Sequence, residues 1–329
     1  MSFSLLGTGS PLLDIQLAVD DRFIAAAVPG AKGGMEPVSA EDIESIIRKS
    51  GRTPEFFPGG AAGNTVFALS RFKVRCALFG KLSAHGDLTS RYLEFCAAHD
   101  VDTSRLIFSE HGSTGCCLAL VTPDAERTMR SALGVSLDLS SSEIKSAAFS
   151  RYDAALFEGF MVYSGKLHEM VMCAHQQGVF TILDLASFEI CRKFRRELTE
   201  IMPCVSMVVA NRQEAEAFTG KSDPEEALDI LSGMVGVCSV KCGADGVWFS
   251  GNGKKFFTPA YPAERVVDTT AAGDLWLAGY ICGKDRGADD RVSVTLGTMF
   301  SSKIIARRGA ILGDDDIIQL EKSINCLLQ

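Results

Sequence analysis

The sequence has no long uninterrupted apolar run, and this absence limits the classes of protein that it can encode. Nowhere do about eighteen apolar residues follow one another, as a membrane-spanning helix requires. Residues 1–6 also lack the basic region and apolar run that begin a signal peptide. The sequence therefore predicts a cytoplasmic protein without a membrane partner.

Cysteine is present but lacks the spacing of metal or redox sites. The chain has eleven cysteines, an odd number, with the adjacent pair Cys116 and Cys117 but no Cys-x-x-Cys motif. The five histidines do not complete a metal-ligand pattern with them. We expect reduced thiols, most of them in the core.

An excess of basic residues is also absent. The chain carries 33 Lys and Arg against 41 Asp and Glu, a net charge of -8, and its basic residues are scattered. Because nucleic-acid binding relies on a clustered basic surface, nucleic acid is not an expected partner. With 329 residues and 47% hydrophobic residues, the chain can instead form one large domain with a small appendage.

Strand and helix patterns alternate from Tyr152 onward. ALFEGF, VFTILDLA and SMVVAN are apolar strand patterns, each followed by a helical pattern, the second of which is predicted to run to Ile201. Such alternation predicts a parallel sheet covered by helices, with ligands bound at the carboxyl ends of its strands. Polar residues stand at those ends: Glu158, Asp184, Asn211 and Asp268.

The stretch RVVDTTAAGDLWLAGY, residues 265–280, is predicted to organise the site. Residues 265–267 are predicted as the end of a buried strand, 268–271 as a tight turn and 272–284 as a helix. The free amides and dipole of that helix start suit a phosphate, and Asp274 in its first turn could accept a proton from an attacking hydroxyl. The alternative is that Asp274 only caps the helix.

Two further stretches carry small or acidic residues where a ligand could approach. PGGAAGNTVFALSRF, residues 58–72, leads through glycines and Asn64 into an apolar helix, which permits close approach but can also serve helix packing alone. In the N-terminal strand pair, Asp14 stands between Leu13 and Ile15. It is either a hydroxyl-binding carboxylate or a solvent-facing strand residue.

VANRQE suggests a magnesium site, because Asn211 ends a strand and Glu214 follows one helical turn later. The same spacing is that of an N-cap with a capping-box glutamate, and both interpretations stay open. Downstream, Gly243 and Gly246 could flank a nucleotide or be turn residues.

Taken in order, these motifs resemble those of the ribokinase-like superfamily, the PfkB carbohydrate kinase family. DTTAAGD, 268–274, looks like its C-terminal signature, PGGAAGN, 58–64, like its N-terminal signature, and NRQE, 211–214, like its Asn-x-x-Glu magnesium motif. The resemblance covers nearly the whole chain and is strongest toward adenosine kinases and bacterial sugar kinases similar to them. GTGSPLLDI and STGCCLALVTPDAERTM carry that part of it.

The resemblance implies one kinase domain over 1–329, with a doubly wound, mostly parallel α/β sheet and a small β lid from about 12–36 and 108–130. It implies ATP-dependent phosphorylation of a hydroxymethyl group, with Asp274 as the base and Mg²⁺ held by Glu214 through water. Asp268 is the candidate ligand of a monovalent cation such as K⁺. The remaining assigned residues are Ala271, Ala272 and Gly273 for the anion hole, Asp14, Gly59, Gly60 and Asn64 for the substrate, and Asn211, Glu214, Lys241, Gly243, Gly246 and Thr269 for ATP.

The acceptor and the oligomeric state stay open at this point. A nucleoside similar to adenosine is expected, with a ribokinase- or fructokinase-type sugar kinase as the alternative, and Phe57, Phe160 and Phe188 are candidates to flank a base. KLSAHGD, residues 81–87, departs from the family pattern, so no substrate contact is assigned there. A non-catalytic binding protein is disfavoured by Asp274, and a dehydrogenase by the lack of GxGxxG after the first strand. Monomer and homodimer are both compatible.

Overall fold

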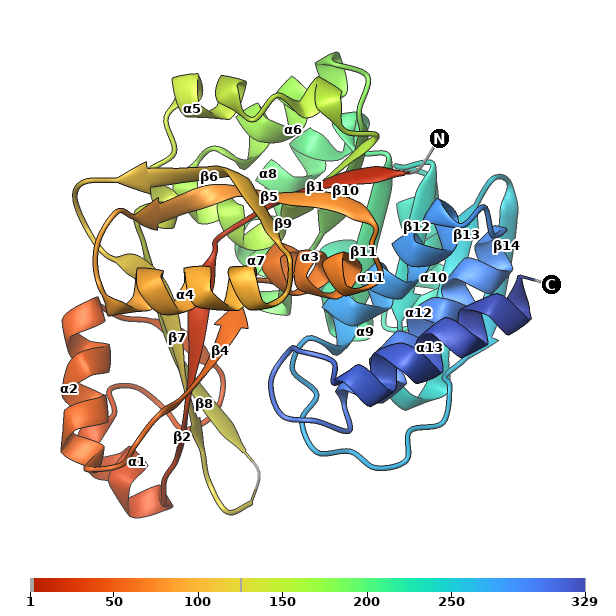
Figure 1. The fold of residues 1–329 in the computed structure, drawn as a ribbon. Helices are drawn as coiled ribbons and strands as arrows, with labels where there is room; N and C mark the ends of the chain where they lie inside the picture. Colours follow the sequence, from red (N-terminus) through yellow and green to blue (C-terminus); the bar gives the residue numbers. More distant parts are fainter. Residues whose placement is uncertain (1–2, 125, 329) are drawn as a thin grey trace.

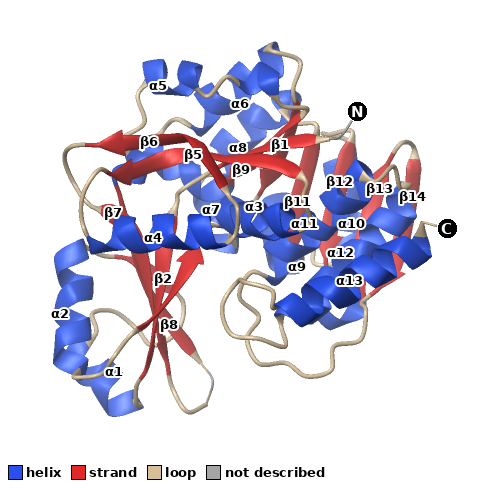
Figure 2. Ribbon diagram, viewed as in Figure 1, coloured by secondary structure: helices blue, strands red, loops and turns tan. Residues whose placement is uncertain are grey.

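The computed structural model describes residues 3–124 and 126–328, and within them two β-sheets organise the molecule (Figure 1). The larger sheet has nine strands in the order β14-β13-β12-β11-β10-β9-β1-β5-β6. The smaller sheet has five strands in the order β3-β8-β7-β2-β4. Figure 2 shows helices on the faces of the larger sheet and the smaller sheet projecting below it.

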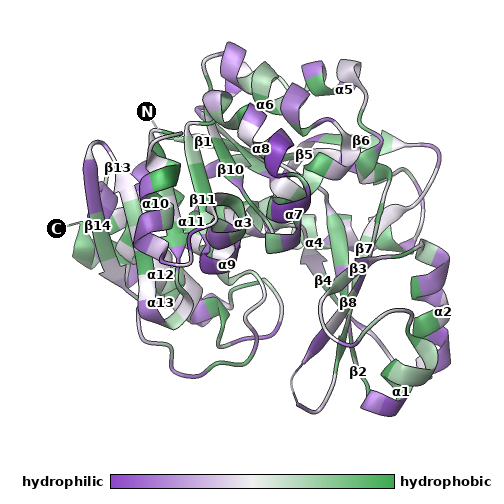
Figure 3. Ribbon diagram, turned by 180° about the vertical axis from the view of Figure 1, so that it is seen from behind, coloured by the Kyte–Doolittle hydropathy of each residue, from purple (hydrophilic) through white to green (hydrophobic). Residues whose placement is uncertain are grey.

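Every strand pair of the larger sheet is parallel except β12 with β13 and β13 with β14. The middle strands are apolar and buried on both faces, as a sheet covered by helices requires (Figure 3). The mostly parallel sheet predicted from the alternation is confirmed. Its strands are β1 Ser4–Thr8, β5 Arg75–Ser83, β6 Asp102–Ser109, β9 Ala154–Glu158, β10 Phe180–Asp184, β11 Met207–Asn211, β12 Val237–Lys241, β13 Gly246–Gly251 and β14 Lys254–Pro259.

Two helical layers bury the two faces of this sheet in separate hydrophobic clusters. One layer contains α3 Ala61–Arg71, α4 Asp87–Ala98, α11 Ala272–Asp285, α12 Asp290–Ile304 and α13 Asp314–Leu327. The other contains α5 Ser141–Ser146, α6 Leu167–Gln176, α7 Phe188–Lys193, α8 Arg195–Ile201, α9 Arg212–Thr219 and α10 Pro224–Ser232. This is the doubly wound arrangement expected from the resemblance.

The smaller sheet presents one face to its own helices and the other toward the larger sheet. Its strands are β2 Leu12–Ala18, β3 Met35–Pro37, β4 Glu55–Gly59, β7 Thr114–Val121 and β8 Arg127–Gly134, and its helices are α1 Asp21–Ala27 and α2 Ala40–Ser50. Ile15 and Leu17 pack in the cluster under these helices. Because side chains alternate along a strand, Asp14 and Gln16 lie on the opposite face, which we call the inner face of the lid.

Two local predictions were wrong. Residues 265–267 form no strand, and Val266 is 67% exposed, because the chain leaves the sheet after β14 and the amide of Val267 donates instead to the carbonyl of Ile305 at the end of α12 (2.7 Å). The helix predicted to run to Ile201 is divided into α7 and α8 at Phe194. Over residues 3–124 and 126–328, none of the helices combines the length and apolar character needed to cross a bilayer.

Candidate active site

The first turn of α11 forms an anion-binding turn. Ala271, its N-cap, adopts a left-handed conformation with φ of 59°, which turns the chain sharply into the helix. The amide of Ala272 donates to Thr269 (3.3 Å), whereas within the described residues the amides of Gly273 and Asp274 have no backbone acceptor. Those two amides, at the positive end of a fourteen-residue helix, are therefore available to an anion.

Asp274 lies in this turn and is held by Asn64. The Asn64 side-chain amide donates to the Asp274 carboxylate at 2.8 Å. Desolvation and the nearby Asp184 raise the pKa of Asp274 to about 7, although Asn64 and Lys241 oppose the shift. A carboxylate with a pKa near 7 is well matched to accept a proton at neutral pH.

Asn64 also has an unused hydrogen-bond acceptor. The residue is only 4% exposed, and its side-chain oxygen has no partner among the described residues. Because its amide nitrogen is committed to Asp274, the oxygen is the free acceptor, and a buried acceptor without a partner is costly. A ligand hydroxyl beside Asp274 would satisfy it.

Asp14 faces this site from the lid. Strand register places Phe57 of β4, Asp14 of β2, Cys117 of β7 and Ser131 of β8 in one row across the inner face. The Asp14 carboxyl lies against Gly59, where a Cβ would come within 2.8 Å of its carbon. Burial raises the pKa of Asp14 to about 7, an effect that Arg127 opposes and that Asp274 and Asp268 support, so the charges of Asp14 and Asp274 influence each other.

The glycines of PGGAAGN have defined roles in this geometry. Gly60, with φ of 88°, precedes α3 and passes so close to the carbonyl of Ser10 that a side chain would clash. The Glu158 carboxylate then accepts the amides of Ala62 (2.7 Å) and Ser10 (3.1 Å). Glu158 thus joins the connection that leads to Asp14 with the helix that carries Asn64, and its burial raises its pKa to about 8.

The carboxyl ends of β10, β11 and β12 bring Asp184, Glu214 and Lys241 together next to α11. Lys241 pairs with Asp184 at 3.4 Å. Asn211 and Glu214 form a capping box: the Glu214 carboxylate accepts the backbone amide of Asn211 at 2.7 Å and its side-chain amide at 2.6 Å. Asn211 and Glu214 therefore form the helix cap that was the alternative to a magnesium site. A helix cap does not exclude a role for Glu214 near a metal.

The charges here fit a hydrated Mg²⁺. Asp184, Glu214 and Asp274 place three carboxyl groups near one lysine, and desolvation followed by the effect of Asp184 raises the pKa of Glu214 to about 7. Within residues 3–124 and 126–328, no three acidic, histidine or cysteine side chains form a metal cluster. Mg²⁺ bound to ATP needs few protein oxygens, so Glu214 acting through water is compatible with this geometry.

Asp268 connects the lid to the anion-binding turn. Its carboxylate pairs with Arg127 of β8 at 3.2 Å and accepts the amides of Thr270 (2.9 Å) and Gly309 (3.2 Å). Although burial opposes the shift, hydrogen bonds from Thr270 and the charge of Arg127 lower its pKa. Asp268, the predicted ligand of a monovalent cation, is therefore already paired with Arg127, which the sequence did not indicate as a site residue.

The other nucleotide candidates are Gly243, Gly246 and Thr269. A Cβ placed on Gly246, whose φ is 133°, would lie 2.8 Å from the Cα of Pro259, so glycine is required by the turn before β13. Gly243, with φ of 61°, borders open space, and Thr269 is exposed beside the anion-binding turn. Of the three aromatic candidates, Phe57 shares the row of Asp14, whereas Phe160 packs against the core. Phe188 lies under Arg192.

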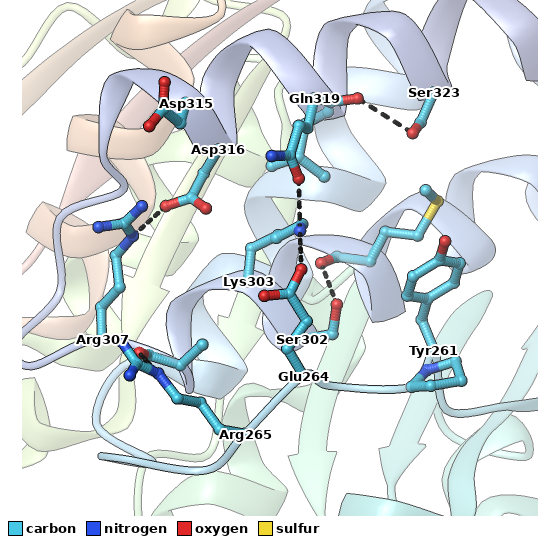
Figure 4. A pocket seen from close by; sticks show the side chains of 14 residues that line it. Tyr261, Glu264, Arg265, Ser302, Lys303, Arg307, Asp315, Asp316, Gln319 and Ser323 are labelled. Carbon is cyan, nitrogen blue, oxygen red and sulfur yellow. Dashed lines mark hydrogen bonds and ion pairs between the residues drawn. The ribbon is translucent and has the colours of Figure 1, made fainter.

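A cavity of about 1010 Å³ lies behind the loop before α11, between that loop, α12 and α13 (Figure 4). Several of its polar groups pair with one another: Lys303 donates to Glu264 (3.3 Å) and Gln319 (2.6 Å), and Arg307 pairs with Asp316. None of the predicted site residues lines it. This cavity therefore contains none of the residues assigned to the chemistry at Asp274.

The raised carboxyl pKa values predict how stability depends on pH. Asp14, Asp274 and Glu214 have pKa values of about 7, and Glu158 of about 8, whereas in the unfolded chain these groups titrate near 4. Between these values the folded protein holds more protons than the unfolded chain, so the free energy of unfolding should fall as pH rises from about 5 to 8. Denaturant titrations of the ligand-free protein across this range measure it.

The matched variant for this measurement is Glu158→Gln, which removes one titrating group. It should flatten the pH dependence of the free energy of unfolding without abolishing it. A wild-type stability that is constant or rises over this interval would contradict the assigned pKa directions.

Comparison with known proteins agrees with the geometry. The model of the pfkB family carbohydrate kinases matches residues 38–317. An uncharacterized sugar kinase of Escherichia coli is 29% identical over 210 residues, which cover 62% of this chain and 65% of that protein. A ribokinase of Staphylococcus aureus is 23% identical over 77% of this chain and 84% of its own length. The crystal structure of an adenosine kinase from Sinorhizobium meliloti superposes with a TM-score of 0.87 at 26% identity, covering 98% of this chain and 99% of that one.

The family match spans most of the chain and includes α3, α9 and α11, the helices that carry Asn64, Glu214 and Asp274. The confirmed resemblance, the doubly wound fold and the anion-binding turn lead to the same conclusion. The chain belongs to the pfkB family of carbohydrate kinases, phosphotransferases whose acceptor is an alcohol group of a sugar or nucleoside.

Proposed function

We propose that this protein transfers the γ-phosphoryl group of ATP to the hydroxymethyl group of a nucleoside similar to adenosine. The observation that carries the proposal is the pairing of Asp274 with Asn64 at the start of α11, next to two unpaired amides. A proton acceptor, a hydroxyl-binding oxygen and an anion-binding turn meet at one place. Phosphoryl transfer requires this combination of alignment and charge stabilisation.

The residues act in the following way. Asp14 and the free oxygen of Asn64 orient the acceptor hydroxyls, and Asp274 takes the proton of the attacking hydroxyl. The amides of Gly273 and Asp274 stabilise the negative charge on the transferred group. Glu214 would hold Mg²⁺ through water, and the bound ion would supply positive charge against the phosphates of ATP. Closure of the lid, which Arg127 ties to Asp268, excludes water from the site.

An exposed apolar surface beside the anion-binding turn suits the base of ATP. Tyr261, Val266 and Val267 are 46%, 67% and 46% exposed in the loop before α11. Exposed apolar side chains gathered next to a phosphate site are typical of a surface that a ligand covers. We therefore place the nucleotide base over this loop, with Thr269 and Gly243 beside its phosphates. Asp268, the predicted K⁺ ligand, is paired with Arg127. Activation by K⁺ is therefore only a proposal.

The inner face of the lid favours a nucleoside over a free sugar. Beyond Asp14 the register brings Gln16, Glu55, Ala119 and Met129 into the next row, in which Ala119 is buried and Met129 is partly exposed. Phe57, also partly exposed, lies beside Asp14 in its own row. A base could pack on Met129 and Phe57 while its ribose reaches Asp274. The similarity to the adenosine kinase of S. meliloti supports the same choice. The sugar kinases among its relatives keep a ribose or hexose acceptor as the second candidate.

A coupled ADP-release assay with nucleosides, ribose and fructose tests the acceptor. A base that buries about 100 Å² at about 25 cal/mol per Å² contributes some 2.5 kcal/mol, which corresponds to nearly a hundredfold preference in kcat/KM over ribose. We expect adenosine or a related nucleoside to show this preference. A pentose or hexose that is phosphorylated at least as efficiently would exclude the nucleoside and leave the kinase assignment intact.

A further inference from the structure

A buried tyrosine hydroxyl group without a partner lies beside the start of α3. Tyr92 of α4 is 0% exposed, and within the described residues its hydroxyl group has no hydrogen-bond partner. A Cβ placed on Gly63 would lie 3.1 Å from the Tyr92 hydroxyl oxygen. The ring packs edge-on against Phe67, one helical turn after Gly63, with the ring centroids 6.0 Å apart. The Tyr92 side chain is therefore directed along α3 toward its first turn.

The first turn of α3 faces the substrate site. Residues three and four apart lie on one face of a helix, so Gly60, Gly63 and Asn64 share a face. From this face Asn64 holds Asp274, and its side-chain oxygen has no partner among residues 3–124 and 126–328. Tyr92 and Asn64 thus bring two unpaired buried polar atoms to the same helical turn.

The Tyr92 hydroxyl group lies on the Asp14 side of the site. Burial raises its pKa well above the usual value, and the charges of Glu158 and Asp14 are among those that raise it further. The hydroxyl group therefore stays protonated and keeps a hydrogen to donate. Helix α4 contacts β2, which carries Asp14, and Thr89, one turn before Tyr92, hydrogen-bonds Thr114 of β7 at 2.6 Å. These contacts fix Tyr92 relative to the lid.

The side chains assigned to the substrate lack a free hydrogen-bond donor. Ionised Asp14 and Asp274 only accept hydrogen bonds, and the Asn64 amide group is already bonded to Asp274. The unpaired Asn64 oxygen also only accepts. A substrate hydroxyl group can donate one hydrogen bond, but its lone pairs need a donor. A buried site whose side chains only accept would leave those lone pairs unpaired, which is costly.

We propose that the Tyr92 hydroxyl group donates a hydrogen bond to a ring hydroxyl of the substrate, which makes Tyr92 a specificity-determining residue. The inference rests on the proposed function and extends it. The ring hydroxyl donates to Asp14 and accepts from Tyr92, whereas the hydroxymethyl group lies at Asp274. Without substrate, the Tyr92 hydroxyl group is an unpaired buried donor that lowers stability, and it gains its partner only in the complex.

Tyr92→Phe in the full-length chain removes only this hydroxyl group. The KM for adenosine should rise about three- to tenfold, the effect of losing one buried hydrogen bond between uncharged groups, while kcat and the KM for ATP stay within twofold. Without ligand, the melting temperature should equal or exceed that of the wild type, because an unpaired buried donor is removed. An unchanged KM for adenosine, or an equal rise in the KM for ATP, would overturn the proposal.

Deoxy analogues test whether the hydroxyl groups of protein and substrate meet. Calorimetry compares the affinity of wild type and Tyr92→Phe for adenosine and for its 2′-deoxy and 3′-deoxy forms. For the analogue that lacks the contacted hydroxyl the two proteins should bind equally, and for the other analogue the difference seen with adenosine should persist. If ribose is the better substrate, ribose and its deoxy forms take their place. An identical loss for every compound would show that Tyr92 makes no such contact.

Tyr280→Phe is the matched control. Tyr280 is also buried, at 6% exposed, but its hydroxyl group donates to Asp290 at 3.3 Å, away from the site. This variant should lower the melting temperature and leave the KM for adenosine within twofold. If it raises that KM as Tyr92→Phe does, the effect is one of packing and the role of Tyr92 is excluded.

The proposed function can fail separately from the role of Tyr92. If the wild type binds adenosine or ribose but phosphorylates neither, the proposed function is wrong, and the comparison of affinities still decides the role of Tyr92. If the wild type binds neither compound, both are wrong.

Discussion

Replacing Asp274 by Asn is expected to reduce kcat by about 10² to 10⁴-fold, the usual contribution of a general base. Asn keeps the size of the side chain and can still bond Asn64, but it cannot accept the proton of the acceptor hydroxyl. Affinity for ATP should stay within a few-fold, because the base acts on the acceptor. Steady-state kinetics with the best acceptor and calorimetric ATP binding measure the two effects.

The matched control for this substitution is Asp290→Asn. Asp290 also lies in the first turn of a helix and accepts from Lys284 (3.1 Å), but it belongs to α12, away from the site. It should leave kcat unchanged. A loss of less than about tenfold in Asp274→Asn would show that Asp274 only places negative charge at the start of α11. The wild-type rate should also fall as pH drops through about 7, since the base then becomes protonated.

The layers of the fold could be predicted because strands that are buried on both faces of a sheet are short, continuous apolar segments in the sequence. β9, β10 and β11 are short apolar segments that end in Glu158, Asp184 and Asn211, and the carboxyl ends of parallel strands meet at one edge of a sheet. The polar residues at this edge were therefore expected to lie together, and Asp184 and Glu214 do. Lys241, which the resemblance assigns to ATP, pairs there with Asp184, a partner that the sequence did not indicate.

In the loop before α11, the apolar pattern of the sequence led to a wrong prediction. Val266 and Val267 were expected in a buried strand but are largely exposed. Residues that are buried in the protein core and residues that a ligand would cover are both apolar. Two consecutive valines in the sequence therefore do not show which of the two surroundings applies. The hydrogen bonds from the amides of Val267 and Asp268 to the carbonyl of Ile305 show that the segment follows the end of α12 and not the sheet.

Arg127 was missed for a different reason. Its role depends on the register between β7 and β8 and on the position of the lid relative to Asp268, and both are long-range properties. The sequence places Arg127 in a strand but does not indicate which face it occupies, since a shift by one residue would reverse it. The role of Asp14 could be anticipated because a carboxylate within an apolar strand is unusual and suggests a function.

Replacing Glu214 by Gln should raise the Mg²⁺ concentration needed for half-maximal rate by about 10 to 100-fold, the usual effect of losing a group that orients the water around a metal. The capping box makes this substitution informative. Either Glu or Gln can accept the amide of Asn211 in such a box, so Gln keeps the helix start while removing the charge. The magnesium titration is therefore expected to change while thermal stability does not.

Two further variants separate the metal role from the cap. Glu214→Ala should disturb both the titration and the stability, because it removes charge and cap together. Glu143→Gln alters an equivalent capping box with Ser140 at the start of α5, outside the site, and should leave the magnesium titration unchanged. If Glu214→Gln has the same magnesium requirement as the wild type, Glu214 is a helix cap alone, and the negative charge that favours Mg²⁺ must come from Asp184 or from ATP itself.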